Sequence, residues 1–300
     1  MSKNDEQSKK ARTRALVLAL LREHAASDGL PTTIRFLFYE LEQRGLAVKP
    51  DREGERKGMR RSIGWPPGSQ DITDAVIKLR EDGTISWDSI ADTERSVDVT
   101  PHWTNMRAFL NDALDSFRLN PFEPDEPPLI LTESRGNAEV LSRVASQYCC
   151  PIAGVKGFVA GFLRTKIAPL FKGNEREVLY LGDYDRSGFD IENNARKTLQ
   201  NAVGRVIAWK RIALTQTQID AGKMEPIWKV DKRDGQGHDA WECEALGQNV
   251  VVSIVRKALA AQLRRYPTAT AARGRTLESV LEREQQLIDE ARLKIRRLRV

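Results

Sequence analysis

The spacing of hydrophobic positions along the chain changes near residue 120. Before it, apolar residues recur at three- and four-residue steps, which places them on one face of an α-helix. Helices are therefore predicted over residues 11–26, 34–44, 69–81 and 103–119. Residues 84–87 predict a short strand after the third helix. Three helices followed by a β element are the order of a winged-helix unit, so we expect a small α+β domain of that type over residues 1–120.

Beyond residue 120, short apolar runs alternate with helical patterns. Four prolines within residues 121–128 predict a stiff, extended linker. Buried strands are predicted within residues 129–132, 150–155, 178–181 and 206–214, with helices over 138–147, 158–171 and 191–203. This alternation predicts an α/β domain with a parallel sheet over residues 129–260. Residues 261–300 predict a basic helical tail, whose charged helix has an apolar stripe interrupted by Glu284.

Composition fits this picture and excludes some classes of protein. The chain has 300 residues, 40% of them hydrophobic and 30% charged, enough for two domains with cores of their own. It contains no apolar run of the roughly 18 residues that span a bilayer, and its polar start lacks a secretory signal, so no membrane association is expected. The three cysteines lack zinc-ligand spacing and are expected to be free, buried thiols in a reducing cytoplasm.

Basic residues are unevenly distributed. The net charge is only +6, but residues 253–275 hold six Arg or Lys and residues 292–300 hold five, in both cases without an acid. Residues 44–65 carry seven basic residues against three acidic ones. Such stretches suit the binding of nucleic-acid phosphates, because each contact releases condensed counterions. The alternative is an ordinary solvated surface.

Acidic residues follow two of the predicted strands. Asp183 and Asp185 stand two positions apart just past residues 178–181, and Gly188 allows a tight turn after them. Glu133 follows the strand at residues 129–132. Because functional groups gather at the carboxyl ends of parallel strands, these carboxylates can converge on one divalent cation if the strands are neighbours. The alternative for residues 183–188 is an Asx-rich turn that caps the next helix.

This combination resembles a Toprim domain. Glu133, with Gly136 close behind, precedes the sequence GDYDRSG at residues 182–188 by about fifty residues, a spacing similar to that of the topoisomerase VI A subunit and the related meiotic double-strand-break transesterase family. The segment GVKGF at residues 154–158 resembles the Lys-Gly-aromatic turn of the family. Residues 211–214, 218–219 and 241–246 resemble a subset of such proteins from phages and mobile elements.

The resemblance implies roles for individual residues. Glu133, Asp183 and Asp185 would bind Mg²⁺, while Lys156 and Arg164 would face phosphate or DNA. Two further acids, Glu242 and Glu244, are interpreted as packing or accessory groups.

A tyrosine near the start of the chain is the candidate nucleophile. Arg35-Phe-Leu-Phe-Tyr39 stands where these relatives end an Arg-x-x-aromatic-Tyr run with the tyrosine that attacks DNA and forms a 5′-phosphotyrosine. Arg35 precedes Tyr39 by four residues, so both share a helix face and the cation could hold a phosphate near the phenol. A phenol with a pKa of about 10 needs a metal or a base to react. The alternative is an aromatic turn that belongs to the core.

Taken together, the motifs and the resemblance predict a cytoplasmic, Mg²⁺-dependent DNA-cleaving protein of the type IIB topoisomerase A-subunit kind. The resemblance also implies a homodimer, because cleavage in the family needs two subunits, with one chain's tyrosine meeting the other's metal. Any ATP-driven strand passage would need a separate ATPase subunit, because the chain has no P-loop or Gly-rich phosphate motif. Three alternatives stay open. They are a Toprim nuclease that activates water, a non-catalytic DNA-binding component of a phage, mobile-element or defence system, and a nucleotide or sugar-phosphate enzyme.

Overall fold

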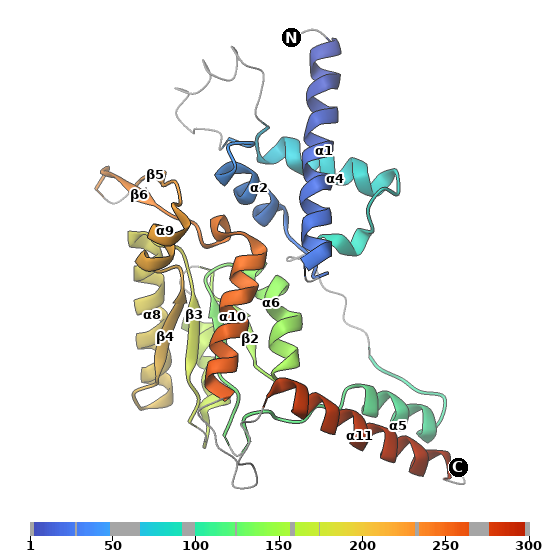
Figure 1. The fold of residues 1–300 in the computed structure, drawn as a ribbon. Helices are drawn as coiled ribbons and strands as arrows, with labels where there is room; N and C mark the ends of the chain where they lie inside the picture. The colour runs from blue at the N-terminus through green and yellow to red at the C-terminus, as the bar shows by residue number, and fades with distance from the viewer. Residues whose placement is uncertain are drawn as a thin grey trace.

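A four-stranded parallel sheet with helices on both faces forms the centre of the computed structural model (Figure 1). The structure describes residues 3–27, 29–48, 67–91, 100–123, 125–156, 160–173, 175–231, 234–263 and 276–297. Across the sheet, the strands are β2 (Ile152–Gly154), β1 (Leu129–Thr132), β3 (Val178–Leu181) and β4 (Trp209–Ala213). The predicted α/β class and the parallel sheet are confirmed, and each strand lies within its predicted run.

The predicted helices are present with shifts at their ends, whereas the helices at residues 216–222 and 248–263 were not predicted. Before the sheet they are α1 (Lys3–Ser27), α2 (Ile34–Gln43), α4 (Ser69–Glu81) and α5 (Met106–Asp115). After β1 they are α6 (Arg135–Gln147), α7 (Ala160–Phe162), α8 (Arg186–Val203), α9 (Gln216–Gly222), α10 (Gln248–Leu263) and α11 (Leu277–Arg296). The helix predicted over residues 158–171 is irregular: α7 continues as a π-helix, Leu163–Ile167, and a 3₁₀ helix, Ala168–Phe171.

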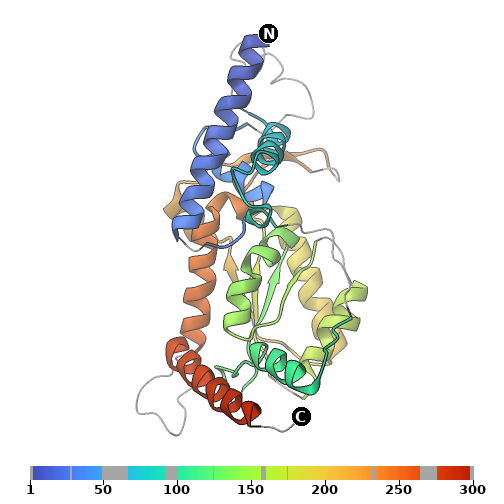
Figure 2. The ribbon, with the colours of Figure 1, turned by 90° about the vertical axis from the view of Figure 1, so that its right-hand side faces the viewer.

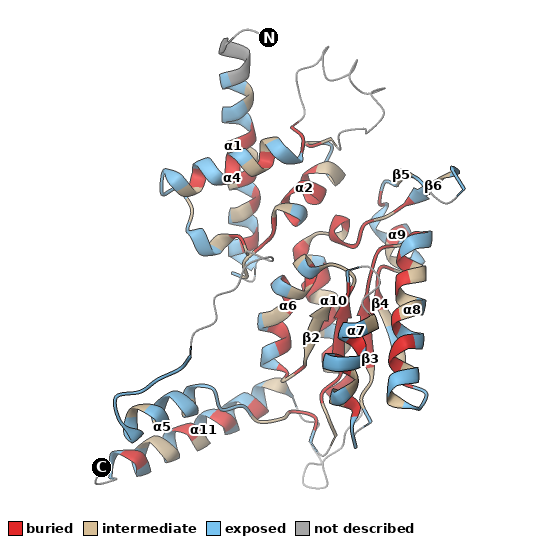
Figure 3. Ribbon diagram, turned by 180° about the vertical axis from the view of Figure 1, so that it is seen from behind, coloured by how far each residue is buried: buried red, intermediate tan, exposed pale blue. Residues whose placement is uncertain are grey.

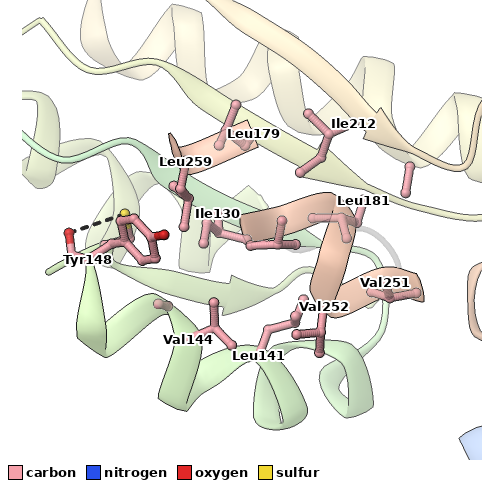
Figure 4. Close-up of a cluster of buried hydrophobic side chains, with 14 of the residues drawn as sticks. Ile130, Leu141, Val144, Tyr148, Leu179, Leu181, Ile212, Val251, Val252 and Leu259 are labelled. Atoms are coloured by element: carbon pink, nitrogen blue, oxygen red, sulfur yellow. Dashed lines mark hydrogen bonds between the residues drawn. The ribbon is translucent and has the colours of Figure 1, made fainter. Parts of the chain in front are cut away.

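Alternate residues of the central strands face opposite layers of helices. Ile130 and Leu179 pack on one face with α6 and α10 (Figure 4). Leu131 and Tyr180 pack on the other face with α8 and the π-helix. Because both faces are covered, β1 and β3 are continuous apolar runs rather than alternating ones. Figure 3 shows the same arrangement, with buried strands between helices whose outer faces are exposed.

The N-terminal helices pack against the sheet region and share a buried cluster with it. Leu37 of α2 and Ile72 of α4 belong to the same cluster as Leu214 and Ala245. The strand predicted at residues 84–87 is wrong. A turn and the 3₁₀ helix η1 (Trp87–Ser89) stand there instead, because the Ser86 side chain accepts a hydrogen bond from the N–H of Asp88 and curls the chain. A single parallel bridge, between Thr32 and Ile90, is the β contact that follows.

The Pro-rich segment predicted as a linker is packed onto the sheet region. Phe122 is 1% exposed and belongs to the core beneath α6 and α10. The Arg176 guanidinium donates to the Pro127 carbonyl and pairs with Glu126, both at 2.7 Å. These contacts fix the path of the chain into β1.

Helices α5 and α11 lie side by side and extend away from the sheet as an arm (Figures 1 and 2). Glu284, predicted to interrupt the apolar stripe of α11, is buried in their contact and accepts a hydrogen bond from the N–H of Leu119 at 2.8 Å. The interruption is therefore a polar contact that fixes α11 against the segment after α5.

The structure also bears on the cysteines, on membrane-spanning helices and on the basic stretches. Cys150 and Cys243 are buried and Cys149 is half-buried, and all three are free thiols. Within the described ranges, every helix is too short or too polar to cross a membrane. Residues 49–66 and 264–275, which hold much of two basic stretches, lie outside the described residues.

Candidate metal centre

Carboxylates meet at the carboxyl ends of β1 and β3. These strands are neighbours, so Glu133 lies beside Asp183, and Glu133 Oε2 accepts a hydrogen bond from the N–H of Asp183 at 3.0 Å. Two glycines permit this approach. A Cβ at Gly182 would lie 3.0 Å from Glu133 Oε2, and one at Gly188 would lie 2.5 Å from the Asp183 carbonyl oxygen. The small residues around the acids are therefore a steric requirement of the site.

Arg211 of β4 fixes the end of β3 from the side. Its Nη1 donates to the carbonyl oxygens of Gly182 and Asp183, at 3.0 and 3.2 Å. Glu192 of α8 holds the guanidinium in place at 2.7 Å from Nε. The backbone that carries Asp183 is thus held by a half-buried cation whose role no local sequence pattern predicted.

A second set of acids comes from the 3₁₀ helix η4 (Cys243–Leu246), which follows β6 (Gly237–Ala240). The N–H of Cys243 donates to Asp183 Oδ1 at 2.8 Å, which brings this segment against the end of β3. The ligand atoms of Asp183, Glu242 and Glu244 lie within 4.8 Å of one another and could hold a metal ion. The sequence interpretation left Glu242 and Glu244 as accessory acids. These two glutamates are two residues apart, as Asp183 and Asp185 are. This spacing is the sequence feature that could have marked them as candidate metal ligands.

Asp185 has a different position from the predicted one. Its Oδ1 accepts the N–H of Gly188 at 2.7 Å and caps the start of α8. Its Oδ2 lies 2.7 Å from Nζ of Lys229, on β5 (Ile227–Val230). Asp185 therefore caps a helix, which is the alternative that the sequence left open for residues 183–188. Glu133 and Asp183 lie side by side as predicted.

Two cations reach into the acidic cluster from different elements. Arg35 of α2 pairs with Glu242 through Nη2, and its Nε lies 2.9 Å from Glu244 Oε1. Lys229 Nζ lies 3.0 Å from Glu242 Oε1. The Ser134 hydroxyl also donates to Glu244 Oε1, at 2.7 Å. The carboxylates outnumber these cations, so the cluster keeps a surplus of negative charge.

Burial and mutual repulsion raise the pKa values of the acids. The pKa of Asp183 lies well above its ordinary 3.8, first because the side chain is desolvated and then because Glu242, Glu133 and Glu244 are close. Burial likewise raises the pKa of Glu133, against the hydrogen bond from Asp183. Glu244 Oε2 is buried without a hydrogen-bond partner. A divalent cation would neutralise the surplus charge and satisfy this oxygen, so the residues present fit a metal ion with oxygen ligands.

Tyr39 lies against the same cluster. The Arg35 guanidinium lies 5.4 Å from the centre of its ring, and its hydroxyl is hydrogen-bonded to Glu242. The side chain is 5% exposed, and burial, with the charge of Glu242, raises the pKa of the phenol above its ordinary 10. The structure therefore brings Arg35 and Tyr39 to Glu242 and Glu244, the acids interpreted as accessory, and Arg35 also lies 4.0 Å from the predicted ligand Asp183.

The predicted phosphate ligands Lys156 and Arg164 lie outside the cluster. Lys156 is exposed just beyond β2, and Arg164 is exposed on the π-helix. Residues 157–159, which carry the rest of the Lys-Gly-aromatic turn, lie outside the described residues.

The fold and the site define an α/β protein with a buried acidic cluster that could bind a metal ion. Neither a family model, nor a curated protein, nor a solved structure matches the chain. The chemistry of the cluster itself therefore supports the functional argument.

Proposed function

We propose that this chain is a Mg²⁺-dependent enzyme that cleaves DNA phosphodiesters at a Toprim-type site, with Tyr39 as the nucleophile. One observation carries the proposal. Arg35 and Tyr39, which come from α2, meet Glu242 and Glu244 about 200 residues later in the chain, beside Asp183 at the end of β3. A nucleophile, a cation and a carboxylate cluster are thus collected in one place from distant parts of the sequence.

The donor set selects the class of metal. Carboxylate oxygens favour hard cations such as Mg²⁺, and the site offers neither thiolate nor imidazole ligands among Asp183, Glu242 and Glu244. When bound there, Mg²⁺ would stabilise negative charge on the phosphate under attack. The Arg35 side chain is 45% exposed, so its guanidinium could hold that phosphate from the solvent side while it contacts Glu242 and Glu244.

We assign Tyr39 the role of nucleophile and Glu242 the role of its base. In the proposed reaction the Tyr39 oxygen forms a bond to phosphorus, and the bond from phosphorus to the 3′ oxygen breaks. The phenol proton passes to Glu242, which is already hydrogen-bonded to the hydroxyl, and the 3′ oxygen takes up a proton from solvent as it leaves. The product is a 5′-phosphotyrosine that retains the energy needed for resealing.

A second candidate follows from the burial of Tyr39. Because this side chain is only 5% exposed, a nuclease that activates water would leave the phenol as a structural partner of Glu242. This alternative uses the same acids and the same metal. It differs only in the nucleophile.

The proposal extends to partners. DNA is the substrate, a homodimer brings two sites to the two strands, the N-terminal helices form a winged-helix-type DNA-binding part, and a separate ATPase subunit would drive strand passage. Support comes from basic side chains on the arm. Arg107, Arg292 and Arg296 line a cleft of about 350 Å³ between α5 and α11, where guanidinium groups could hold backbone phosphates.

The test is incubation with supercoiled DNA and Mg²⁺, followed by assay for cleaved strands and for protein-linked 5′ ends. Wild-type protein should give both, and Tyr39→Phe should give neither. Tyr148→Phe is the matched control, because Tyr148 is equally buried, at 6%, but lies in the sheet core. Asp183→Asn should abolish cleavage and leave DNA binding intact.

The other outcomes separate the alternatives. Cleavage by Tyr39→Phe without a covalent adduct would show that water is the nucleophile. Binding without cleavage by the wild-type chain would indicate a DNA-binding component, and no binding at any salt concentration would reject a role on nucleic acid.

A further inference from the structure

The β5–β6 hairpin places a lysine inside the acidic cluster. The hairpin projects beyond the sheet at the end where α2 lies (Figure 1). Its side chains alternate: Trp228 and Val230 are 67% and 52% exposed, while Lys229, between them, turns inward. The inward side of the hairpin therefore delivers a positive charge to the ends of the parallel strands.

Several contacts hold the hairpin in this position. Tyr184, between the two aspartates of the motif, pairs with Trp241 through both backbone N–H groups, at 2.8 and 3.2 Å. Arg186, at the start of α8, reaches Asp231 at 3.3 Å and Asp234 at 2.6 Å. The position of Lys229 is thus set at both ends of the hairpin.

Lys229 binds the oxygens that a second ion would use. Its Nζ lies 2.7 Å from Asp185 Oδ2 and 3.0 Å from Glu242 Oε1. Asp185 Oδ2 is the oxygen that the helix cap leaves free. Glu242 divides its two oxygens, Oε2 toward Arg35 and Oε1 toward Lys229. One carboxylate thus contacts two side-chain cations, Arg35 on the side of Asp183 and Glu244 and Lys229 on the side of Asp185, as a bridging carboxylate contacts two metal ions.

We propose that the Lys229 ammonium takes the place of a second divalent cation, so that the site binds one metal ion, held by Asp183, Glu242 and Glu244. This inference rests on the proposed metal site. Lys229 supplies one positive charge beside the metal at any metal concentration. It also pairs with Asp185 Oδ2, the oxygen that the helix cap alone would leave unpaired. It also explains why Asp185 stands apart from the three acids that could share an ion.

The experiment counts bound Mn²⁺ in the full chain without DNA. Binding is titrated by calorimetry, and the spectrum of the bound ions is recorded by electron paramagnetic resonance. Wild-type protein should bind one ion with the signal of an isolated Mn²⁺. Lys229→Met should bind two, with the exchange coupling expected of ions about 3.5–4 Å apart. Lys210→Met, which alters an exposed lysine on β4, should behave as wild type.

A double variant tests which carboxylate holds the second ion. Lys229→Met combined with Asp185→Asn should return to one ion, because the amide keeps an acceptor for the helix cap and loses the charge that binds metal. Two controls test for misfolding. Lys229→Gln removes the charge but retains a hydrogen-bond donor toward Glu242, and circular dichroism of every variant measures its secondary structure.

The outcomes distinguish this inference from the function on which it rests. Two ions in wild type, or one ion in both Lys229→Met and Lys229→Gln, would overturn the role of Lys229 and leave the metal site standing. No ion in any variant would overturn the metal site and this inference together.

Discussion

The interior of the sheet and its carboxyl end lie two residues apart, at Leu181, the last residue of β3, and at Asp183 just beyond it, and they differ in what they contribute. Leu181 is fully buried among apolar side chains, while Asp183 is buried among carboxylates that repel it. The interior stabilises the fold by removing apolar surface from water. The carboxyl end raises the free energy of the folded chain unless a cation is bound. Stability therefore comes from the interior, whereas the acidic cluster at the carboxyl end weakens the metal-free fold and is better explained by a function than by folding.

Ile130→Ala, in the interior, should have the largest effect on stability. Ile130 is fully buried between β3 and the helices α6 and α10, so its truncation leaves a cavity. We expect the free energy of unfolding to fall by about 2–5 kcal/mol. Urea unfolding followed by circular dichroism measures it. The loss should be the same with and without Mg²⁺, and a loss that depends on metal would contradict the separation of the two regions.

Gly188→Ala should disturb the carboxyl end by a smaller amount. The added Cβ would lie 2.5 Å from the Asp183 carbonyl and 3.2 Å from Glu133 Oε2, so the backbone must shift. We expect a loss of about 1–3 kcal/mol together with weaker metal binding. Gly161→Ala is the control, because a Cβ there meets nothing within 4 Å. Equal metal affinity in both variants would show that the close approach of Glu133 and Asp183 is not needed.

The same contrast explains what the sequence could predict. The strands and the acids at their ends follow from local patterns, since β1 and β3 are continuous apolar runs and Glu133 and Asp183 come directly after them. The position of Lys229 does not follow from a local pattern, because this residue reaches the site through a hairpin whose placement depends on tertiary contacts. The strand expected at residues 84–87 failed for a local reason, because the Ser86 hydroxyl accepts the N–H of Asp88 and the chain continues as a 3₁₀ helix.

The pH dependence of stability should report the repulsion at the carboxyl end. Burial raises the folded-state pKa of Asp183 and of Glu133 above the ordinary 3.8 and 4.5. As the pH rises through these ordinary values, the unfolded chain loses its protons first while the folded chain keeps them. Stability therefore falls from about pH 4 upward, by about 1.4 kcal/mol for each unit of raised pKa.

Urea unfolding between pH 4.5 and 7.5, in chelator and in excess Mg²⁺, checks this dependence. The metal holds the carboxylates in their charged form, so the decline should be present in chelator and absent with Mg²⁺. A decline of the same slope in both conditions would assign it to groups elsewhere in the chain.

Asp183→Asn should have the smallest effect on stability and the opposite sign. The amide oxygen can still accept the N–H of Cys243, while the charge that faces Glu133, Glu242 and Glu244 is removed. We expect the metal-free variant to be more stable than wild type at pH 7 by about 1 kcal/mol. In excess Mg²⁺ the order should reverse, because wild type gains binding energy that the variant lacks. Ile130→Ala cannot produce such a crossing, since it acts alike in both conditions. If the variant is less stable than wild type in chelator, Asp183 stabilises the metal-free fold. The acidic end would then differ from the sheet interior only in composition.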